Sequence, residues 1–163
     1  MADQFELTDE MRSAIGAESP PWNYEVTSTG IRAFARGVGY TDPVYFDVAA
    51  AQAAGYRNLP APPTYVGIPV FIPGISHPVF STPAKGLPEV KHGLAGLLDG
   101  GSETEYLETV CAGDTLTAVT KIAGLEVRES RSLGKMLIVT IESTYTNQDD
   151  RTALIQRGQV IYY

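Results

Sequence analysis

The sequence predicts an α+β domain in which short helices precede an antiparallel β-sheet. Helical patterns are confined to residues 27–71, whereas residues 102–163 are rich in Thr, Val, Ile and Tyr and are divided by turn residues. Consecutive strands joined by short turns are antiparallel, and such a sheet buries one face against helices. A length of 163 residues suits one domain, so we expect a single domain over 1–163, with 1–19 as an N-terminal extension.

Composition and charge exclude several classes of protein. Hydrophobic residues make up 44% and charged residues 19% of the chain, as in ordinary globular proteins. The net charge of -7 disfavours binding to nucleic acids or anionic membranes. The most apolar window, TYVGIPVFIPGI, is interrupted by Pro69 and Pro73, so we expect no membrane span. The N-terminal residues MADQFELTDEM lack the basic flank and apolar core of a signal peptide, which predicts a cytoplasmic protein.

Two short helices are predicted before the sheet. Residues 27–38 combine capping hydroxyls with apolar residues at helical spacing and are followed by a glycine. Residues 46–55 offer Asp47 as the N-cap, an alanine-rich body and Gly55 after the last turn. Both helices are too short to be stable alone, so each must pack against the rest of the domain.

The middle of the chain is rich in proline. A third helix is predicted from Tyr65 to Phe71, entered through Pro62 and Pro63, because proline fits the first turn of a helix but not its interior. Residues 75–88 are expected to form a loop or lid, since loops of this length inside a compact domain are usually functional.

Four strands are predicted in the C-terminal part of the chain. Their sequences are SETEYLETV, GDTLTAVTKIAGLEV, KMLIVTIESTYTN and TALIQRGQVIYY. They are separated by turns at 112–114, 129–134 and 147–150, which predicts an antiparallel meander. Such a meander leaves its edge strands open, so we expect a dimer that covers them.

Residues 40–67, YTDPVYFDVAAAQAAGYRNLPAPPTYVG, carry a family resemblance. An Asp-Pro-x-aromatic step precedes an alanine-rich helix that ends in Gly-Tyr, followed by a proline-rich turn and a short apolar helix. An Ala-Gly-Asp turn then opens the meander. This order resembles the MaoC-type (R)-specific hydratases and dehydratases, whose hot-dog fold wraps an antiparallel sheet around a central helix. The resemblance extends over residues 20–163. It is greatest to the N-terminal MaoC-like or FAS1-like dehydratase branch, and within it to the non-catalytic subunits of heterodimeric (3R)-hydroxyacyl-ACP dehydratases.

In catalytic members of that family the step reads Asp-x-Asn-Pro-hydrophobic-His, and the Asp and His activate a water molecule. The resemblance places Tyr40 at the Asp, Asp42 at the Asn and Tyr45 at the His. A phenol, with an ordinary pKa of about 10, is a poor proton carrier near neutral pH. The resemblance therefore implies an acyl-thioester-binding subunit of an enoyl hydratase or 3-hydroxyacyl dehydratase. A catalytic MaoC-like partner would supply the Asp and His, although a homodimer stays open.

The resemblance also implies a lining for the acyl tunnel, namely Tyr45, Pro62, Thr64, Tyr65 and Gly93. Backbone N–H groups at the N-terminus of the central helix would hold the thioester carbonyl oxygen. The expected ligand is an acyl-CoA or an acyl-ACP, and an acidic carrier protein would need a local basic patch. The candidates for that patch are Arg32, Arg36 and Arg57.

Two other functions stay open. A self-sufficient hydratase would use Asp42 and Tyr45 as a substitute acid–base pair, with the carboxyl pKa raised by burial, or His92 at the tunnel mouth. Alternatively, the chain is a non-enzymatic acyl-thioester-binding module. Structural roles compete with each candidate: Asp42 is also a typical turn or helix cap, Tyr45 a filler of the missing histidine's space, and His92 a strand-end residue.

The other polar residues do not form a recognisable site. His77 lies in the expected lid, Cys111 has no base near it in sequence, and the carboxylates of Glu103, Glu105 and Glu108 are typical of a solvated strand face. Two histidines far apart and one cysteine predict no metal site. The glycines of Gly37-Val38-Gly39 fall short of a dinucleotide fingerprint, so we expect no nucleotide cofactor.

Overall fold

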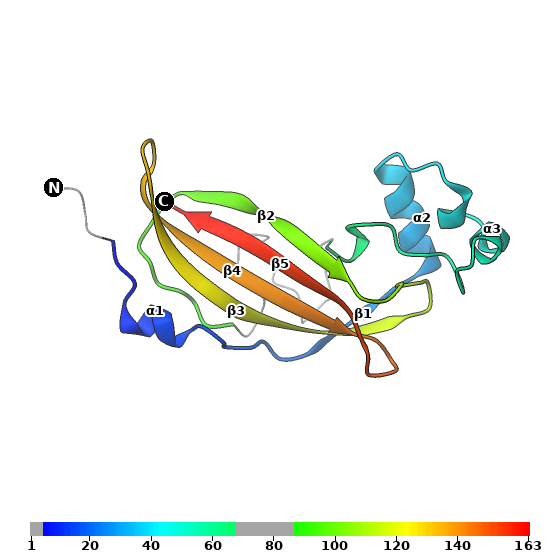
Figure 1. The fold of residues 1–163 in the computed structure, drawn as a ribbon, viewed down its shortest axis with the longest axis horizontal. Helices are drawn as coiled ribbons and strands as arrows, with labels where there is room; N and C mark the ends of the chain where they lie inside the picture. The colour runs from blue at the N-terminus through cyan, green and yellow to red at the C-terminus, as the bar shows by residue number, and fades with distance from the viewer. Residues whose placement is uncertain (1–4, 68–86) are drawn as a thin grey trace.

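The computed structural model describes residues 5–67 and 87–163, which form a five-stranded antiparallel sheet with short helices gathered mainly at one end (Figure 1). The strands are β1 (Trp22–Glu25), β2 (Leu97–Tyr106), β3 (Thr115–Ser130), β4 (Gly134–Thr146) and β5 (Thr152–Tyr162). The α-helices are α1 (Asp9–Ser13), α2 (Ser28–Gly37) and α3 (Val48–Ala53), and the 3-10 helices are η1 (Pro43–Tyr45) and η2 (Tyr65–Gly67). The predicted α+β class is confirmed.

Helices α2 and α3 lie where the sequence predicts them. The Thr27 hydroxyl accepts a hydrogen bond from the Gly30 N–H at 3.0 Å, and Asp47 caps α3 in the same way at 2.7 Å. Gly55 follows α3 with φ +93°, a conformation that glycine adopts without a steric penalty. The third predicted helix begins as η2. Its remainder, with most of the predicted lid at 75–88, lies outside the described residues.

The strand order corrects the predicted meander. The order is β1-β3-β4-β5-β2, so β2 pairs with β5, whereas a simple meander places β2 beside β3. Residues 107–114 cross the ends of β5 and β4 instead, and the Leu107 and Glu108 N–H groups donate to the Ala153 carbonyl at 2.9 and 3.0 Å. The composition of β2, LLDGGSETEY, explains its place. Almost all of its residues are exposed, which suits an edge strand better than a central one.

The two edges of the sheet differ in how they are covered. Strand β1 pairs with the first residues of β3, and the preceding segment continues along β3. In that segment, the Gly16 and Ser19 N–H groups donate to the carbonyls of Ile122 and Thr120 at 2.8 and 2.7 Å. At the other edge, β2 has no neighbouring strand among the described residues on its outer side. Strand β1 escaped the sequence analysis because four residues are too few to show a clear alternation.

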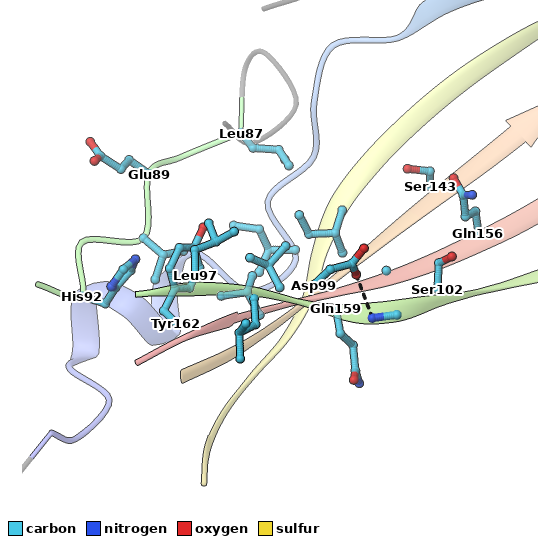
Figure 2. Close-up of a pocket in the computed structure, with 18 of the residues that line it drawn as sticks. Leu87, Glu89, His92, Leu97, Asp99, Ser102, Ser143, Gln156, Gln159 and Tyr162 are labelled. Carbon is cyan, nitrogen blue, oxygen red and sulfur yellow. Dashed lines mark hydrogen bonds between the residues drawn. The ribbon is translucent and has the colours of Figure 1, made fainter. Parts of the chain in front are cut away.

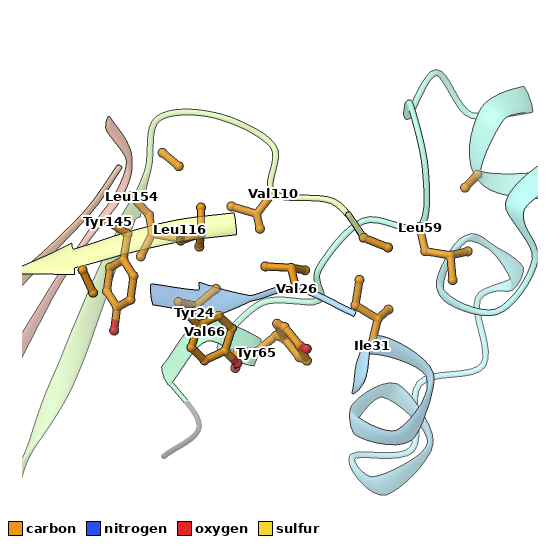
Figure 3. Close-up of a cluster of buried hydrophobic side chains, with 14 residues drawn as sticks. Tyr24, Val26, Ile31, Leu59, Tyr65, Val66, Val110, Leu116, Tyr145 and Leu154 are labelled. Atoms are coloured by element: carbon orange, nitrogen blue, oxygen red, sulfur yellow. The ribbon is translucent and has the colours of Figure 1, made fainter. Parts of the chain in front are cut away.

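The core consists of two clusters of buried side chains. The larger one joins the helical end to the sheet (Figure 3), and its largest members are Tyr24, Ile31, Leu59, Tyr65, Leu116, Tyr145 and Leu154. The second cluster lies toward the other end of the sheet and contains Ala14, Ile122, Leu137 and Val139, with Leu94 and Tyr162 packed against it. Helices α2 and α3 and the turn at Pro62–Tyr65 therefore pack on the first cluster, whereas the end of α1 packs on the second.

A buried carboxylate ties three loops together. Asp114, whose side chain is 2% exposed, accepts hydrogen bonds from the Arg57 guanidinium, from the Cys111 N–H at 2.8 Å and from the Gln148 amide at 3.1 Å. Burial alone would raise the pKa of Asp114. The hydrogen bonds from Arg57, Cys111 and Gln148 outweigh burial, so the pKa lies below its ordinary value.

Candidate functional site

The Asp-Pro step forms a capped turn between α2 and α3. The Asp42 carboxylate accepts a hydrogen bond from the Val44 N–H at 3.0 Å and acts as the N-cap of η1. Pro43 occupies the first turn of that helix, where proline fits. The competing structural role of Asp42 is therefore the one that its contacts support, and its carboxylate is exposed rather than buried.

Tyr45 is half-buried and packs against the larger core cluster. Its ring stacks on Tyr40, with 5.5 Å between ring centroids and 25° between ring planes. Burial, followed by the electrostatic effect of Tyr40 and Asp42, raises the pKa of Tyr45 above its ordinary value. Because a phenol with a raised pKa keeps its proton at neutral pH, Tyr45 is poorly suited to take a proton from water.

The turn at Pro62–Tyr65 has an unusual backbone. Thr64 adopts φ +66°, which costs a β-branched residue about 1–2 kcal/mol. The Thr64 N–H donates to the Tyr106 hydroxyl oxygen at 2.9 Å, and the Tyr65 N–H donates to the Pro62 carbonyl at 3.0 Å. Pro62 and the Tyr65 ring are buried, whereas Thr64 is exposed.

Tyr65 is fixed by a close fit against α2 and by neighbouring aromatic rings. Its ring centroid lies 6.1 Å from that of Tyr24 and 5.7 Å from that of Phe34, both in edge-to-face arrangements. A Cβ atom added at Gly30 would lie 2.5 Å from the Tyr65 hydroxyl oxygen. Three of the five predicted lining residues, Pro62, Thr64 and Tyr65, thus lie in this one turn.

Replacing Gly30 with alanine is expected to destabilise the protein by about 1–2 kcal/mol, because displacing the packed Tyr65 ring outweighs the helix-propensity gain of about 1 kcal/mol. Urea denaturation followed by circular dichroism measures the change. Gly37→Ala in the same helix is the control, because an added Cβ there meets no atom within 4 Å and the variant should not lose stability for steric reasons. Equal stability changes in the two variants would contradict the close fit.

His92 and Gly93 lie at the other end of the sheet from Tyr45 and the Thr64 turn. The His92 ring packs on Tyr162 near the C-terminus, with 3.9 Å between ring centroids, and its Nδ1 accepts a hydrogen bond from the Leu94 N–H at 3.1 Å. Burial lowers the pKa of His92 despite the opposing charge of Glu89, so the imidazole is neutral at pH 7. The structure therefore does not bring His92 together with Asp42.

The three candidate arginines are not equally available for a ligand. Arg57 pairs with Asp114. The Nε atom of Arg32 donates to the Phe46 carbonyl at 2.9 Å, which fastens α2 to the segment after η1. Arg32 and Arg36 lie about one turn apart on α2, and both are exposed. They therefore present positive charge at the end of the molecule where α2 and α3 lie.

A cavity of about 790 Å³ lies on one face of the sheet (Figure 2). Apolar side chains line it near the ends of β4 and β5, among them Val139, Val160 and Tyr162. Polar side chains, including Ser143 and Gln156, line its other part. The volume is in the range of small-molecule sites. Alternate residues of each strand, such as Val139, Ile141 and Ser143 of β4, line the cavity because they share one face of the sheet. The sequence analysis predicted these strands but not the cavity.

The remaining predicted polar residues have structural roles. Cys111 is buried, and burial raises the pKa of its thiol, which disfavours a nucleophilic role. Glu105 faces Arg157 at 3.6 Å, and Glu108 faces Arg151 at 3.2 Å. Within residues 5–67 and 87–163, no group of three His, Cys, Asp or Glu side chains is placed to hold a metal ion. His77 lies outside the described residues. No helix in the described part of the chain is long and apolar enough to cross a membrane.

The structure shares the hot-dog fold of solved MaoC-like proteins. The structure resembles a MaoC-like dehydratase with a TM-score of 0.72 and 21% identity, covering 93% of this chain and 43% of that one. It resembles the ChsH1-ChsH2 complex from Mycobacterium tuberculosis with a TM-score of 0.70 and 16% identity, covering 96% and 97% of the two chains. It also resembles the truncated HadBC (3R-hydroxyacyl-ACP dehydratase) complex from the same organism, with a TM-score of 0.63 and 21% identity over 89% and 93%. The predicted hot-dog fold is confirmed.

Sequence comparison narrows the class to a family. The chain belongs to the family described as the FAS1-like dehydratase domain region, whose model matches residues 13–156. A UPF0336 protein of Streptomyces avermitilis is 35% identical over 116 residues, which cover 71% of this chain and 73% of that protein. The resemblance inferred from the Asp-Pro step and the proline-rich turn is thereby confirmed at the level of the family.

Proposed function

We propose that this chain is the acyl-thioester-binding, non-catalytic subunit of an (R)-specific enoyl hydratase or 3-hydroxyacyl dehydratase. The observation that carries the proposal is the state of the Asp-Pro step. The family resemblance matches Tyr40 and Tyr45 to the positions of the catalytic Asp and His, and the two rings stack on each other. Asp42 is engaged as a helix cap. The turn keeps its shape without a group that takes a proton from water near neutral pH.

The acyl thioester is proposed to bind at the turn Pro62–Tyr65 and beside Tyr45. Tyr65 belongs to the larger core cluster, and Tyr45 packs against it. Thr64 is exposed and directly precedes the buried Tyr65, the first residue of η2. The exposed Arg32 and Arg36 at the same end are suited to the phosphates of CoA or of a carrier protein's prosthetic group. Gly93 lies at the other end of the sheet from this turn, so its position supports a role in lining the same site least among the five residues.

A catalytic partner is proposed to associate through β2, which has no strand on its outer side within residues 5–67 and 87–163. Strand β2 carries exposed apolar side chains that are not expected at an unpaired edge, namely Leu97, Leu98 and Tyr106, with Leu107 next to it. Long exposed edges invite pairing with another chain. The ChsH1-ChsH2 and HadBC structures are complexes of two named components, which supports a heterodimer.

Isothermal titration with octanoyl-CoA tests the binding function. The purified chain, alone or with its co-purified partner, is expected to bind octanoyl-CoA, and Tyr45→Ala is expected to weaken binding by about tenfold or more, because an aromatic packing surface is lost. Tyr163→Phe at the C-terminus is the control. If the chain binds no acyl-CoA in either state, the proposal is wrong.

Replacing Leu98 with lysine is expected to weaken association of the chain with a partner or a second copy by about tenfold or more, because a charge would be buried at the edge. Sedimentation velocity over a range of concentrations measures it. Leu133→Lys is the matched control, since Leu133 is similarly exposed but lies in the β3–β4 turn. Weakening of association by Leu133→Lys alone would place the interface elsewhere.

A further inference from the structure

The turn Pro62–Tyr65 is contacted from a distant strand. The Thr64 N–H donates to the hydroxyl oxygen of Tyr106, 42 residues further along the chain. Tyr106 is the last residue of β2, and Figure 1 shows β2 ending beside the segment that contains η2. One hydrogen bond therefore connects the edge strand to the turn.

The two sides of this turn are fixed by different forces. On one side, Tyr65 is buried at 5% exposure, and the Tyr24 hydroxyl donates to the Tyr65 carbonyl at 3.4 Å. On the other side, Thr64 is exposed and has φ +66°, which a β-branched residue rarely adopts. A strained residue persists only where its surroundings hold it. The Tyr106 hydroxyl is the group that holds the Thr64 amide.

We propose that Tyr106 is a positioning residue for acyl-thioester binding. By accepting the Thr64 N–H, its hydroxyl keeps Pro62–Tyr65 in the left-handed turn that presents Thr64 and Tyr65 to the ligand. The assignment of the turn to the ligand rests on the proposed function. The hydrogen bond itself and the backbone conformation do not depend on it.

Tyr106→Phe removes the hydroxyl and keeps the ring, so it tests the role without disturbing the strand. Amide hydrogen exchange of residues 62–67 and titration with octanoyl-CoA are the readouts. Exchange of the Thr64 amide is expected to accelerate by about tenfold and binding to weaken several-fold. Tyr163→Phe is the matched control, because Tyr163 meets β2 at its opposite end, where it exchanges backbone hydrogen bonds with Gly96 at 2.7 and 3.1 Å. It should change neither readout.

Thr64→Gly separates positioning from a general loss of stability. Glycine adopts positive φ without strain, so the turn should form without help from Tyr106. The effect of Tyr106→Phe on binding is expected to shrink in the Thr64→Gly background, which a double-mutant cycle measures.

Several results would overturn the assignment. These are unchanged exchange at Thr64 in Tyr106→Phe, tighter octanoyl-CoA binding by that variant, or an equal binding loss in both backgrounds. If the wild-type chain binds no octanoyl-CoA, the proposed function fails separately. Exchange at Thr64 then decides whether Tyr106 holds the turn, with unchanged exchange again overturning it.

Discussion

Replacing Asp114 with alanine is expected to lower the free energy of unfolding by about 3 kcal/mol. The carboxylate is 2% exposed and holds Arg57, the Cys111 N–H and Gln148 at once. Arg57 is 52% exposed and can regain water, whereas the Cys111 N–H is buried and would lose its acceptor. Urea denaturation monitored by circular dichroism measures the loss. Glu126→Ala, which breaks the exposed pair with Arg128, is the control and should leave stability unchanged.

The same carboxylate should make stability sensitive to acid. The pKa of Asp114 is lower in the folded chain than its ordinary value, so its contribution is fully present above the unfolded pKa of about 3.9. The contribution is lost as the pH falls through the lower folded pKa. Asp114→Asn should therefore flatten the decline in stability below about pH 4. A decline as steep as in the wild-type chain would contradict the role assigned to Asp114.

Adding the proposed catalytic partner is expected to raise crotonyl-CoA hydration at least a hundredfold over this chain alone, since positioned acid–base catalysis contributes roughly 10²–10⁴-fold. Co-expression of the two chains and a steady-state assay of the purified complex measure the increase. Asp42→Asn in this subunit keeps the cap on η1 and removes the charge, so the rate of the complex should stay within about twofold. A complex that loses its activity with Asp42→Asn would assign chemistry to this subunit.

Helices and strands that depend on residues close together in sequence could be predicted from local patterns. Helix α3 was predicted with its N-cap Asp47, and α2 with capping hydroxyls at its start, of which Thr27 is the N-cap in the structure. Both predictions were possible because capping and propensity act within a few residues. Strands β3, β4 and β5 were predicted within three residues at each end from their β-branched composition. The predicted start of β2, Ser102, lies five residues after the observed start, Leu97, because LLDGG shows no alternation of apolar and polar residues.

Contacts between distant segments could not be predicted. The place of β2 beside β5, the Asp114–Arg57 pair and the contact of Tyr106 with Thr64 all join residues far apart in sequence. No single-sequence pattern reports which strands are neighbours in a sheet. The residues Ala-Gly-Asp predicted a turn at 112–114. The burial of Asp114 could not be predicted, because it depends on Arg57 and Gln148 in two other loops.

The candidate site was predicted in part. Pro62, Thr64 and Tyr65 lie within four residues of the sequence, so they were bound to lie close together in the structure. Tyr45 packs against the same core cluster because α2, η1 and α3 fold onto it. Gly93 and His92 lie beside the second cluster, and their separation from the turn reflects the length of β2, which connects the two ends of the sheet.

Hydration of crotonyl-CoA by the chain purified alone tests the central claim most directly. Because the proposed function assigns Tyr40 and Tyr45 to the positions of the catalytic Asp and His, it predicts no rate above the uncatalysed background at any pH between about 6 and 8, where histidine normally titrates. Octanoyl-CoA binding by the same preparation shows that the chain is folded and competent. A hydration rate that disappears with Asp42→Asn or with His92→Ala would contradict the account, because this chain would then carry its own catalytic group.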